Sequence, residues 1–371
     1  MAHPAGIGAV KPDGWAYNRA PMIVYWELTN ACGLACRHCR ATAMPDPAPG
    51  ELSTAEAIAL LDDIRGFGDP TAGEALPHLV MTGGDPLRRP DLAELIAAAA
   101  ARGIGVSLAP AVTPLLTRER IFWMKEAGVQ AISLSLDGSN AARHDGVRMV
   151  PGTFDATIEA LDIAAEADLP VQVNTLVTAA TAADLPAVFD LLSGHTLQQW
   201  SLFFLISIGR GTELVELSPG EAERVLLWAQ QVGRGARFRV KTTEAMHYRR
   251  LGAAALLRAG KTKDEIEAHP MSRAFGIRDG NGIVFVSNTG DVTPSGFLPL
   301  AVGNVKRSSL VDLYRDDPML RSLRDPAQFT GRCGSCEYRD WCGGSRARAY
   351  AWTGDPLESD PLCPYQPKAG R

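Results

Sequence analysis

The chain has 371 residues, of which 46% are hydrophobic and 21% are charged, the balance of an ordinary globular protein. Its length exceeds the roughly 250–300 residues that one core usually serves, so we expect a large domain and a smaller one. The net charge of −5 argues against a broad nucleic-acid surface, and the longest apolar run, residues 95–101, is far shorter than the ~20 residues that span a bilayer.

The first residues contain no apolar signal segment, so we expect a cytoplasmic protein without a membrane or nucleic-acid partner. In that reducing compartment cysteines bind metals or take part in catalysis more often than they form disulfides.

From residue 22 onward, apolar runs of strand length alternate with helical patterns. Strands are expected over residues 22–29, 78–81, 104–109, 131–136, 171–177 and 201–206. Helices are expected from Ser53, over residues 91–101, and from near residues 117, 153, 183 and 218. Six such units predict an α/β fold with a parallel sheet and right-handed crossovers, in which chemistry collects beyond the C-terminal ends of the strands.

The remainder of the chain changes character. Another strand is expected over residues 238–243, a helical segment over 251–275 and a hairpin over 282–292. The last hundred residues are rich in Gly, Pro, Arg and Cys, and so few apolar residues call for a metal to hold them. We therefore predict an N-terminal extension (1–20), a main domain (21–235), a connecting segment (236–280) and a metal-binding domain (281–371).

Seven cysteines fall into two groups, and none lies between residues 40 and 332. The first group, Cys32, Cys36 and Cys39, has the spacing CxxxCxxC. Three thiolates can hold three irons of a [4Fe–4S] cluster and leave the fourth open to an external ligand, as catalytic metal sites require. A zinc site is the alternative, but His38 lies between Cys36 and Cys39 in the sequence, so its side chain cannot easily point to the same metal as both cysteines.

The second group is Cys333, Cys336, Cys342 and Cys363. Four thiolates close a site completely, so spacing alone fits a fully ligated [4Fe–4S] cluster or an all-cysteine zinc site. The presence of a first cluster in the same chain favours a second, auxiliary cluster.

These motifs resemble the radical S-adenosylmethionine (SAM) superfamily with its C-terminal SPASM or twitch extension, over residues of about 20 to 366. Residues 82–86 (Thr-Gly-Gly-Asp-Pro) are similar to the family's GGE motif, residues 133–138 to a fourth strand of SPASM enzymes, and residues 144–148 to their SAM-carboxylate segment. The resemblance implies a partial (βα)6 TIM-type barrel with a small C-terminal iron–sulfur domain. It also implies an oxidoreductase that reductively cleaves SAM to a 5′-deoxyadenosyl radical, which abstracts hydrogen from a substrate.

The resemblance also implies roles for single residues. Cys32, Cys36 and Cys39 hold the catalytic cluster, and Gly83 and Gly84 let the backbone approach the methionine part of SAM. Asp85 offers an acceptor to its ammonium group; the alternative is a turn in which Asp85 caps a helix.

Other polar residues are expected around SAM. Arg148 pairs with its carboxylate, and Ser135 and Asp137 bond the ribose or carboxylate or else cap a strand end. Asn174 contacts SAM or makes a core hydrogen bond, and His38 lies near the adenine or faces solvent.

Glu244, His247 and Tyr248 are candidates for substrate contact or proton transfer, with a satisfied polar cluster as the alternative. Arg346 and Arg348 are further candidates for meeting substrate carboxylates, and a basic face near the second cluster explains them equally well.

Among subfamilies, the resemblance is strongest to enzymes acting on heme d1 precursors and on iron-coproporphyrin, through residues 203–205, 209–211, 241–249 and 342–350. Ser295 and Ser345 stand where members with two auxiliary clusters carry cysteine, which favours a single auxiliary cluster here. Met246 and Glu244 also depart from the heme branch, where Pro and Cys are common.

These observations leave three functions open. The first is a radical enzyme acting on a small tetrapyrrole, with an auxiliary cluster that moves an electron to or from the substrate radical. The second is maturation of a ribosomally made peptide, and the third is a non-catalytic electron carrier or zinc scaffold. A flavodoxin or ferredoxin is the expected electron donor.

Overall fold

The computed structural model describes residues 15–69 and 74–368. Strands alternate with helices along the first two thirds of the chain, as the sequence predicts. The strands are β1 (Ile23–Glu27), β2 (His78–Thr82), β3 (Val106–Leu108), β4 (Ala131–Ser135), β5 (Val171–Val177), β6 (Gln199–Phe204), β7 (Arg239–Thr243), β8 (Ile283–Val286), β9 (Asp291–Thr293) and β10 (Gly303–Asn304).

Helices follow most of the parallel strands and continue into the C-terminal part. They are α1 (Thr54–Arg65), α2 (Leu92–Ala101), α3 (Arg118–Glu126), α4 (Ala141–Arg148), α5 (Thr153–Glu166), α6 (Leu185–Ser193), α7 (Pro219–Gly233), α8 (His247–Arg258), α9 (Lys263–Glu267), α10 (Leu310–Asp316), α11 (Pro318–Arg324), α12 (Gly331–Gly334) and α13 (Arg346–Thr353). Short 3₁₀ helices are η2 (Pro86–Arg88), η3 (Ala182–Asp184), η4 (Gly209–Glu213), η5 (Pro270–Ala274) and η6 (Pro326–Gln328).

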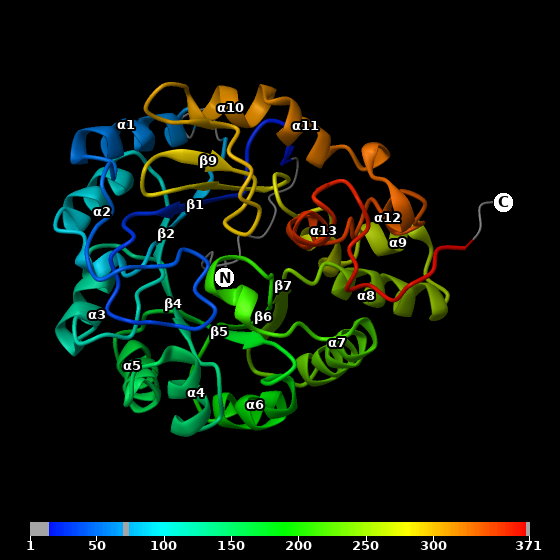
Figure 1. The fold of residues 1–371 in the computed structure, drawn as a ribbon, viewed down its shortest axis with the longest axis horizontal. Helices are drawn as coiled ribbons and strands as arrows, with labels where there is room; N and C mark the ends of the chain where they lie inside the picture. Colours follow the sequence, from blue (N-terminus) through cyan, green and yellow to red (C-terminus); the bar gives the residue numbers. More distant parts are fainter. Residues whose placement is uncertain (1–14, 70–73, 369–371) are drawn as a thin grey trace.

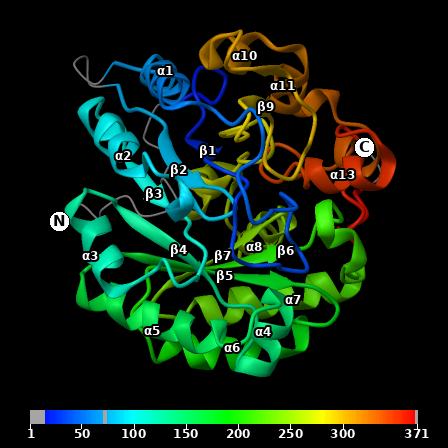
Figure 2. The same cartoon turned by 60° about the vertical axis from the view of Figure 1, so that its left-hand side comes forward.

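All strands join one sheet in the order β10-β9-β8-β1-β2-β3-β4-β5-β6-β7. Strands β1 to β7 pair in parallel with their sequence neighbours, and helices α1–α3 and α5–α7 lie on the outside of the curved sheet (Figures 1 and 2). This is the mostly parallel α/β architecture of the predicted partial barrel.

Each of the strands β1 to β6 has an apolar face that is buried in the main core, whereas the other face of β4 and β5 carries polar residues such as Ser133 and Asn174. Val24 and Trp26 of β1 and Leu79 and Met81 of β2 are fully buried. The helices begin at recognisable caps: Ser53 and Glu56 form a capping box at the start of α1, as the sequence predicts.

The predicted hairpin exists, and it extends the sheet. Strand β8 pairs in parallel with β1, from Ile23 opposite Ile283 to Trp26 opposite Val286, and β9 pairs back on β8. The predicted domain limits remain a prediction, but the hairpin lies within the barrel's sheet. Of the predicted N-terminal extension, residues 1–14 lie outside the described residues.

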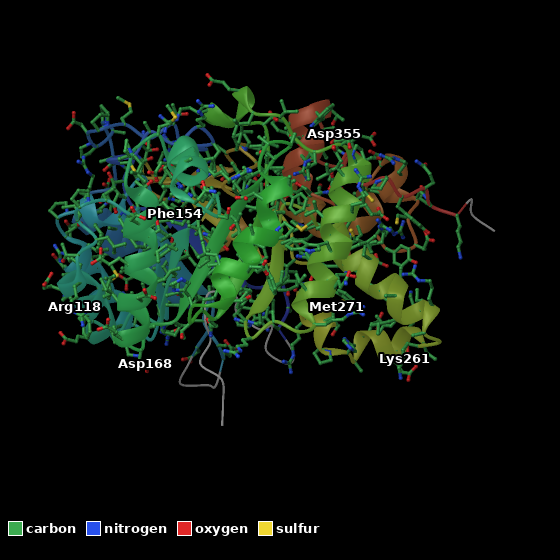
Figure 3. All side chains as sticks on the ribbon, turned by 90° about the horizontal axis from the view of Figure 1, so that it is seen from below. Arg118, Phe154, Asp168, Lys261, Met271 and Asp355 are labelled. Carbon is green, nitrogen blue, oxygen red and sulfur yellow. The ribbon has the colours of Figure 1, made fainter. Side chains whose placement is uncertain are left out.

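The segment from α8 to η5 lies at the opposite end of the molecule from α3 and α5. Figure 3 shows this arrangement, with Lys261 and Met271 marking the first segment and Arg118 and Phe154 marking α3 and α5. Cys336 and Cys342 pack with Ala253 of α8 and Ile266 of α9, so this cysteine segment lies against the helices that follow β7. Figure 1 shows α12 and α13 on the same side of the molecule as α8 and α9.

Several helices were not predicted. Helix α4 begins at Asn140, whose side chain accepts a hydrogen bond from the Arg143 amide, but it buries only His144 and contains Gly146. It therefore lacks the apolar stripe that identifies a helix in a sequence. Helices α10 to α13 were missed for a related reason, because their segments are short and polar. Within the described ranges, every helix is too short or too polar to cross a membrane.

A single carboxylate ties the end of β1 to the hairpin. The Glu51 Oε1 atom accepts hydrogen bonds from the Asn30 amide (2.7 Å), the Thr29 hydroxyl (3.0 Å), the Ala48 amide (3.0 Å) and the Asn288 side-chain amide (3.0 Å). Glu51 thus fixes the point at which the first cysteine loop leaves the sheet.

We predict that Glu51→Ala lowers the free energy of unfolding by about 2–3 kcal/mol, because it leaves several donors of a charge-assisted network unpaired. Chemical denaturation of the anaerobic protein measures this. Glu94→Ala, at an exposed position of α2, is the control and should change stability by less than about 0.5 kcal/mol. Equal losses in the two variants would contradict the role of Glu51.

Candidate functional site

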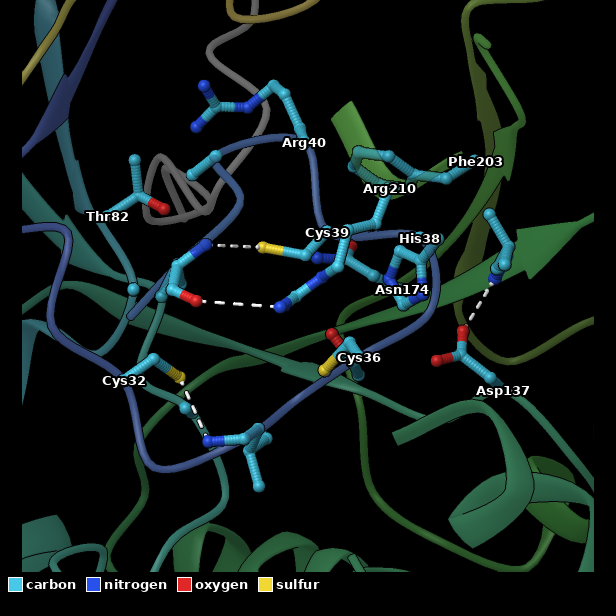
Figure 4. Close-up of a pocket in the computed structure, with 18 of the residues that line it drawn as sticks. Cys32, Cys36, His38, Cys39, Arg40, Thr82, Asp137, Asn174, Phe203 and Arg210 are labelled. Atoms are coloured by element: carbon cyan, nitrogen blue, oxygen red, sulfur yellow. Dashed lines mark hydrogen bonds between the residues drawn. The ribbon is translucent and has the colours of Figure 1, made fainter. Parts of the chain in front are cut away.

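The three N-terminal cysteines lie on one loop that begins just beyond β1 (Figure 4). Backbone pairing closes the loop at its base: the Cys32 amide donates to the Met44 carbonyl (2.7 Å) and the Met44 amide to the Asn30 carbonyl (3.1 Å). The cysteines form no disulfide. The sequence therefore delivers three thiols to one loop at the C-terminal end of a parallel strand.

Each of the three sulfurs has a hydrogen-bond donor beside it. The Leu34 amide lies 3.3 Å from the Cys32 Sγ, the Ala43 amide 3.3 Å from the Cys39 Sγ, and the Arg148 Nη1 3.5 Å from the Cys36 Sγ. Such donors stabilise thiolates and the sulfurs of iron–sulfur clusters. Burial raises the pKa of Cys32 to about 11, so metal binding must displace a proton from this thiol.

The loop forms one wall of a cleft of about 250 Å³ at the C-terminal ends of the strands. The rest of the cleft comes from residues at the ends of β2 to β6. Every residue predicted to contact SAM lines it except Asp85: His38, Gly83, Gly84, Ser135, Asp137, Arg148 and Asn174.

Gly83 and Gly84 are required because the turn after β2 packs on the loop after β1. A Cβ atom on Gly83 would lie 2.7 Å from the Thr29 carbonyl oxygen, and one on Gly84 would lie 2.4 Å from the Ala31 carbonyl oxygen. No side chain fits at these distances. The glycine pair therefore brings the β2 turn against the cysteine loop and into the cleft wall.

Asp85 is fully buried and caps η2. Its carboxylate accepts hydrogen bonds from the Leu87 amide (3.1 Å) and the Thr113 hydroxyl (2.9 Å). This is the capping role that the sequence left open. Contact between Asp85 and the SAM ammonium stays a prediction, and in this structure the carboxylate already has these two partners.

Asp137 and Arg148 form an ion pair within the cleft. The Asp137 Oδ2 lies 2.5 Å from the Arg148 Nη2, and the Asp137 Oδ1 accepts from the Leu176 amide (2.7 Å). Burial works against ionisation of Asp137, but the Arg148 guanidinium, His38, His144 and the Leu176 amide together lower the pKa of the carboxyl. Both members of the pair line the cleft, and Arg148 also approaches the Cys36 sulfur.

Asn174 takes part in the core hydrogen bonds that were the alternative to a SAM contact. Its Oδ1 accepts from the Gln172 Nε2 (2.6 Å), and its Nδ2 lies 3.4 Å from the Ser133 hydroxyl. Its side chain still lines the cleft, so both roles remain open to it.

Several buried polar atoms of the cleft have no hydrogen-bond partner in the described part of the chain. They are the His38 Nδ1, the Arg148 Nε, and the Arg210 Nε and Nη2. Burial lowers the pKa of His38 to about 4, so this ring is neutral near pH 7. Buried polar atoms normally have partners, so these unmet groups fit a polar ligand between the cysteine loop and the strand ends.

Sequence reasoning gave no role to two arginines and an aromatic pair of this cleft. Arg40 follows Cys39 directly and pairs with Glu27 (2.7 Å), whereas the Arg210 guanidinium faces no carboxylate among the cleft's described residues. Phe203 and Phe297 pack together with ring centroids 6.4 Å apart. From the sequence, the Gly-Arg-Gly segment after β6 had no assigned function beyond its similarity to the heme branch.

The candidate substrate residues lie elsewhere. Glu244, His247 and Tyr248 do not line the cleft. Glu244 is buried, and its carboxylate accepts from the Ser345 hydroxyl (2.5 Å); burial and Asp279 raise its pKa to about 8. His247 is fully buried, and burial lowers its pKa to about 4. A substrate role for the three stays a prediction.

The expectation that Arg346 and Arg348 meet substrate carboxylates is wrong, because both are fully buried and used within the fold. Arg348 pairs with Glu216 (2.7 Å) and donates to the Glu244 and Leu205 carbonyls. Arg346 donates to two backbone carbonyls and approaches the Cys333 Sγ to 3.5 Å.

The four C-terminal cysteines line one small cavity between α12 and the last residues of the chain. Burial raises the pKa of Cys342 to about 12 and of Cys363 to about 11. In residues 15–69 and 74–368, no three His, Cys, Asp or Glu side chains converge closely enough to hold a single metal ion.

The serines that replace cysteines of two-cluster relatives are buried and hydrogen-bonded. Ser295 donates to Asp279, and Ser345 donates to Glu244. Both serines therefore belong to a packed polar region, and the single auxiliary cluster stays a prediction.

Comparison with known proteins gives a consistent answer. Residues 26–192 match the model of the Radical SAM superfamily. The AdoMet-dependent heme synthase of Methanosarcina barkeri is 37% identical over 95% of this chain and 99% of that protein, and that of Nitratidesulfovibrio vulgaris is 38% identical over 99% and 98%. The crystal structure of Streptococcus suis SuiB bound to precursor peptide SuiA has the same fold, with a TM-score of 0.71, 16% identity, and coverage of 94% of this chain and 76% of that one.

The geometry of the site and the similarity along the whole chain lead to the same assignment. The site has three thiols on one loop with a cleft beside them. This chain is a member of the radical SAM superfamily, an enzyme of a family that binds a [4Fe–4S] cluster and S-adenosylmethionine.

Proposed function

We propose that this enzyme modifies a side chain of a tetrapyrrole in heme biosynthesis. The observation that carries the proposal is the likeness to AdoMet-dependent heme synthases along the whole chain, at 37% and 38% identity. The second alignment covers 99% of this chain, so it includes both cysteine groups.

The cleft supports a flat substrate with carboxylate arms. Phe203 and Phe297 offer apolar ring faces, and Arg40 and Arg210 line the same cleft. Asp137 is the one carboxylate among the described residues that line it, and Arg148 already pairs with it. The unpaired guanidinium of Arg210 is therefore free to bind a carboxylate of the macrocycle.

The chain's own residues prepare the reaction. When bound, the cluster and SAM supply an electron and a 5′-deoxyadenosyl radical that abstracts hydrogen. Cys32, Cys36 and Cys39 provide three ligands and so keep one iron open for SAM. The Asp137–Arg148 pair orients the SAM carboxylate, and the packed Gly83-Gly84 turn fixes the wall against which the methionine part lies.

We place a second [4Fe–4S] cluster at Cys333, Cys336, Cys342 and Cys363, as the proposed auxiliary site. With four thiolates such a cluster would have no open iron, so it would not bind the substrate. These cysteines would instead hold a group that can take up an electron from the substrate.

We predict that Cys36→Ala abolishes formation of 5′-deoxyadenosine from SAM and dithionite, because two thiolates cannot hold the catalytic cluster. Chromatography of the quenched anaerobic reaction measures the product. Cys342→Ala, which leaves the N-terminal loop intact, is the matched control and should still cleave SAM. Unchanged cleavage in Cys36→Ala would refute the cluster assignment.

We predict that the reconstituted enzyme holds about eight irons, and Cys342→Ala about four, if both groups bind [4Fe–4S] clusters. Metal analysis and product assays check this. The variant should form no modified tetrapyrrole although it cleaves SAM. About four irons and one zinc in the unaltered enzyme would contradict the auxiliary cluster.

We predict that iron-coproporphyrin binds with a change in its visible absorbance, and that Arg210→Gln weakens this binding about tenfold to a hundredfold, the worth of one charge-assisted hydrogen bond. Spectral titration measures both. Arg237→Gln, at an exposed position before β7, is the control. If the unaltered enzyme showed no binding, a peptide substrate would replace the tetrapyrrole; equal affinities in both variants would exclude Arg210 from recognition.

A further inference from the structure

Two fully buried arginines lie against the four C-terminal cysteines, and we call Arg278 and Arg346 the buried arginine pair. Their exposed fractions are 1% and 0%. The Arg346 Nη2 lies 3.5 Å from the Cys333 Sγ. Arg278 packs against Gly343, the residue after Cys342, where an added Cβ atom would lie 3.0 Å from its Cδ and 3.2 Å from its Nε.

Glycines make this approach possible. Gly343 and Gly344 line the cysteine cavity with φ values of +72° and +65°, and a Cβ atom on Gly344 would lie 2.6 Å from the Arg346 Nη2 and 3.1 Å from the Cys333 Sγ. The Gly-Gly turn therefore leaves both guanidinium groups directly behind the wall of the cavity.

Neither member of the pair forms an ion pair with a carboxylate of the described chain. Arg278 donates to the carbonyls of Gly276 (2.9 Å), Leu323 (3.1 Å) and Arg324 (3.4 Å). Arg346 donates to those of Glu358 (2.7 Å) and Pro356 (3.1 Å). Carbonyl oxygens satisfy these N–H groups, and the nearby carboxylates of Asp279 and Glu358 act on the pair without forming an ion pair with it. A buried positive charge without a directly paired anion is costly in the protein interior.

The other charged groups around the cavity are already compensated or exposed. Arg250 pairs with Glu223 (2.6 Å), Arg339 lies 3.8 Å from Asp340, and Asp360 lies 3.6 Å from Arg348. Arg332 is half-exposed, so water screens its charge. Arg249 is an exception: it lies close enough to Cys342 to act on it electrostatically, but it is half-buried and donates to the Ile277 carbonyl. Among the described residues around the cavity, Arg278 and Arg346 are the fully buried arginines without an ion pair.

The N-terminal cysteine loop has a different environment. Arg148, which approaches the Cys36 Sγ, is paired with Asp137, and Arg40 is paired with Glu27. The third guanidinium of that cleft, Arg210, is the one proposed to bind a substrate carboxylate. The two cysteine groups thus differ in their electrostatic environment: Arg40 and Arg148 beside the N-terminal cysteines are paired with carboxylates, and the buried arginine pair is not.

We propose that the buried arginine pair sets the auxiliary cluster as the electron acceptor of the reaction, by holding its reduction potential above that of the SAM-binding cluster. This inference rests on the proposed function. An iron–sulfur cube with four thiolates is an anion that gains one more negative charge on reduction, and buried positive charge stabilises the reduced form.

The electron count is then closed. Hydrogen abstraction removes one hydrogen atom from the substrate and leaves a carbon radical. As that radical gives one electron to the oxidised auxiliary cluster, the bond from the neighbouring carbon to its carboxylate breaks, carbon dioxide leaves, and a carbon–carbon double bond forms. The cluster is then reduced by one electron and the substrate is oxidised. An external one-electron carrier protein of the ferredoxin or flavodoxin class then reoxidises the auxiliary cluster.

The test measures each cluster alone by potentiometric titration followed by electron paramagnetic resonance. The combined variant Cys32→Ala, Cys36→Ala and Cys39→Ala retains only the auxiliary cluster, and Cys342→Ala retains the SAM-binding cluster. We expect the auxiliary cluster to have the higher midpoint potential. An equal or lower midpoint would overturn the proposal without any arginine variant.

In the background that retains only the auxiliary cluster, Arg346→Gln and Arg278→Gln should lower its midpoint potential. Arg346→Lys keeps the positive charge and should therefore retain most of the original midpoint potential. Arg339→Gln changes a half-exposed, paired arginine of the same cavity and should leave the midpoint potential unchanged. If the cluster is present and its midpoint potential is the same in both Gln variants as in their background, the role of the pair is overturned. Zinc or no metal at this site would instead refute the proposed auxiliary cluster.

Discussion

The close packing of two backbone turns is the constraint on which the site depends. The turn after β2 lies so close to the loop after β1 that neither Gly83 nor Gly84 has room for a side chain beyond hydrogen. The same loop is closed at its base by the pairing of Cys32 with Met44 and is anchored by Glu51. Three thiols, a glycine wall and the strand ends are thereby fixed relative to one another before any ligand binds.

Charge is distributed unevenly around the two cysteine groups. Near the N-terminal loop, Arg40 and Arg148 each form an ion pair with a carboxylate. Among the cleft's described arginines, only Arg210 therefore has a positive charge without such a partner. Near the C-terminal cysteines, Arg278 and Arg346 are buried against backbone carbonyls. Four thiolates would supply the missing negative charge, which gives the cysteines a part in folding as well as in metal binding.

Much of this molecule could be read from its sequence, because the strands are apolar runs bounded by turns and the cysteine spacings are specific. The ends of β2, β4 and β5 were placed well enough to bring Gly83, Asp137 and Asn174 to one cleft. Helix α4 escaped notice because its one buried side chain, His144, makes no periodic pattern.

What the sequence could not show is which polar groups already have partners. Asp85 resembles a SAM ligand, but its carboxylate caps η2 and binds Thr113. Arg348 resembles a substrate contact, yet it pairs with Glu216, which is 132 residues away in the chain. Conversely, nothing in the sequence separates Arg210 from Arg40, since the difference lies in whether an acid comes close in three dimensions.

The pairing of β8 with β1 also bears on how such a protein could be divided. One strand, Ile23–Glu27, carries the catalytic loop at its end and the first strand of the C-terminal part along its flank. A chain cut before residue 283 would expose a row of unpaired amides and carbonyls on β1, an open edge that invites aggregation. The N-terminal cysteine loop and the C-terminal part therefore depend on the same strand, and we regard them as one folding unit.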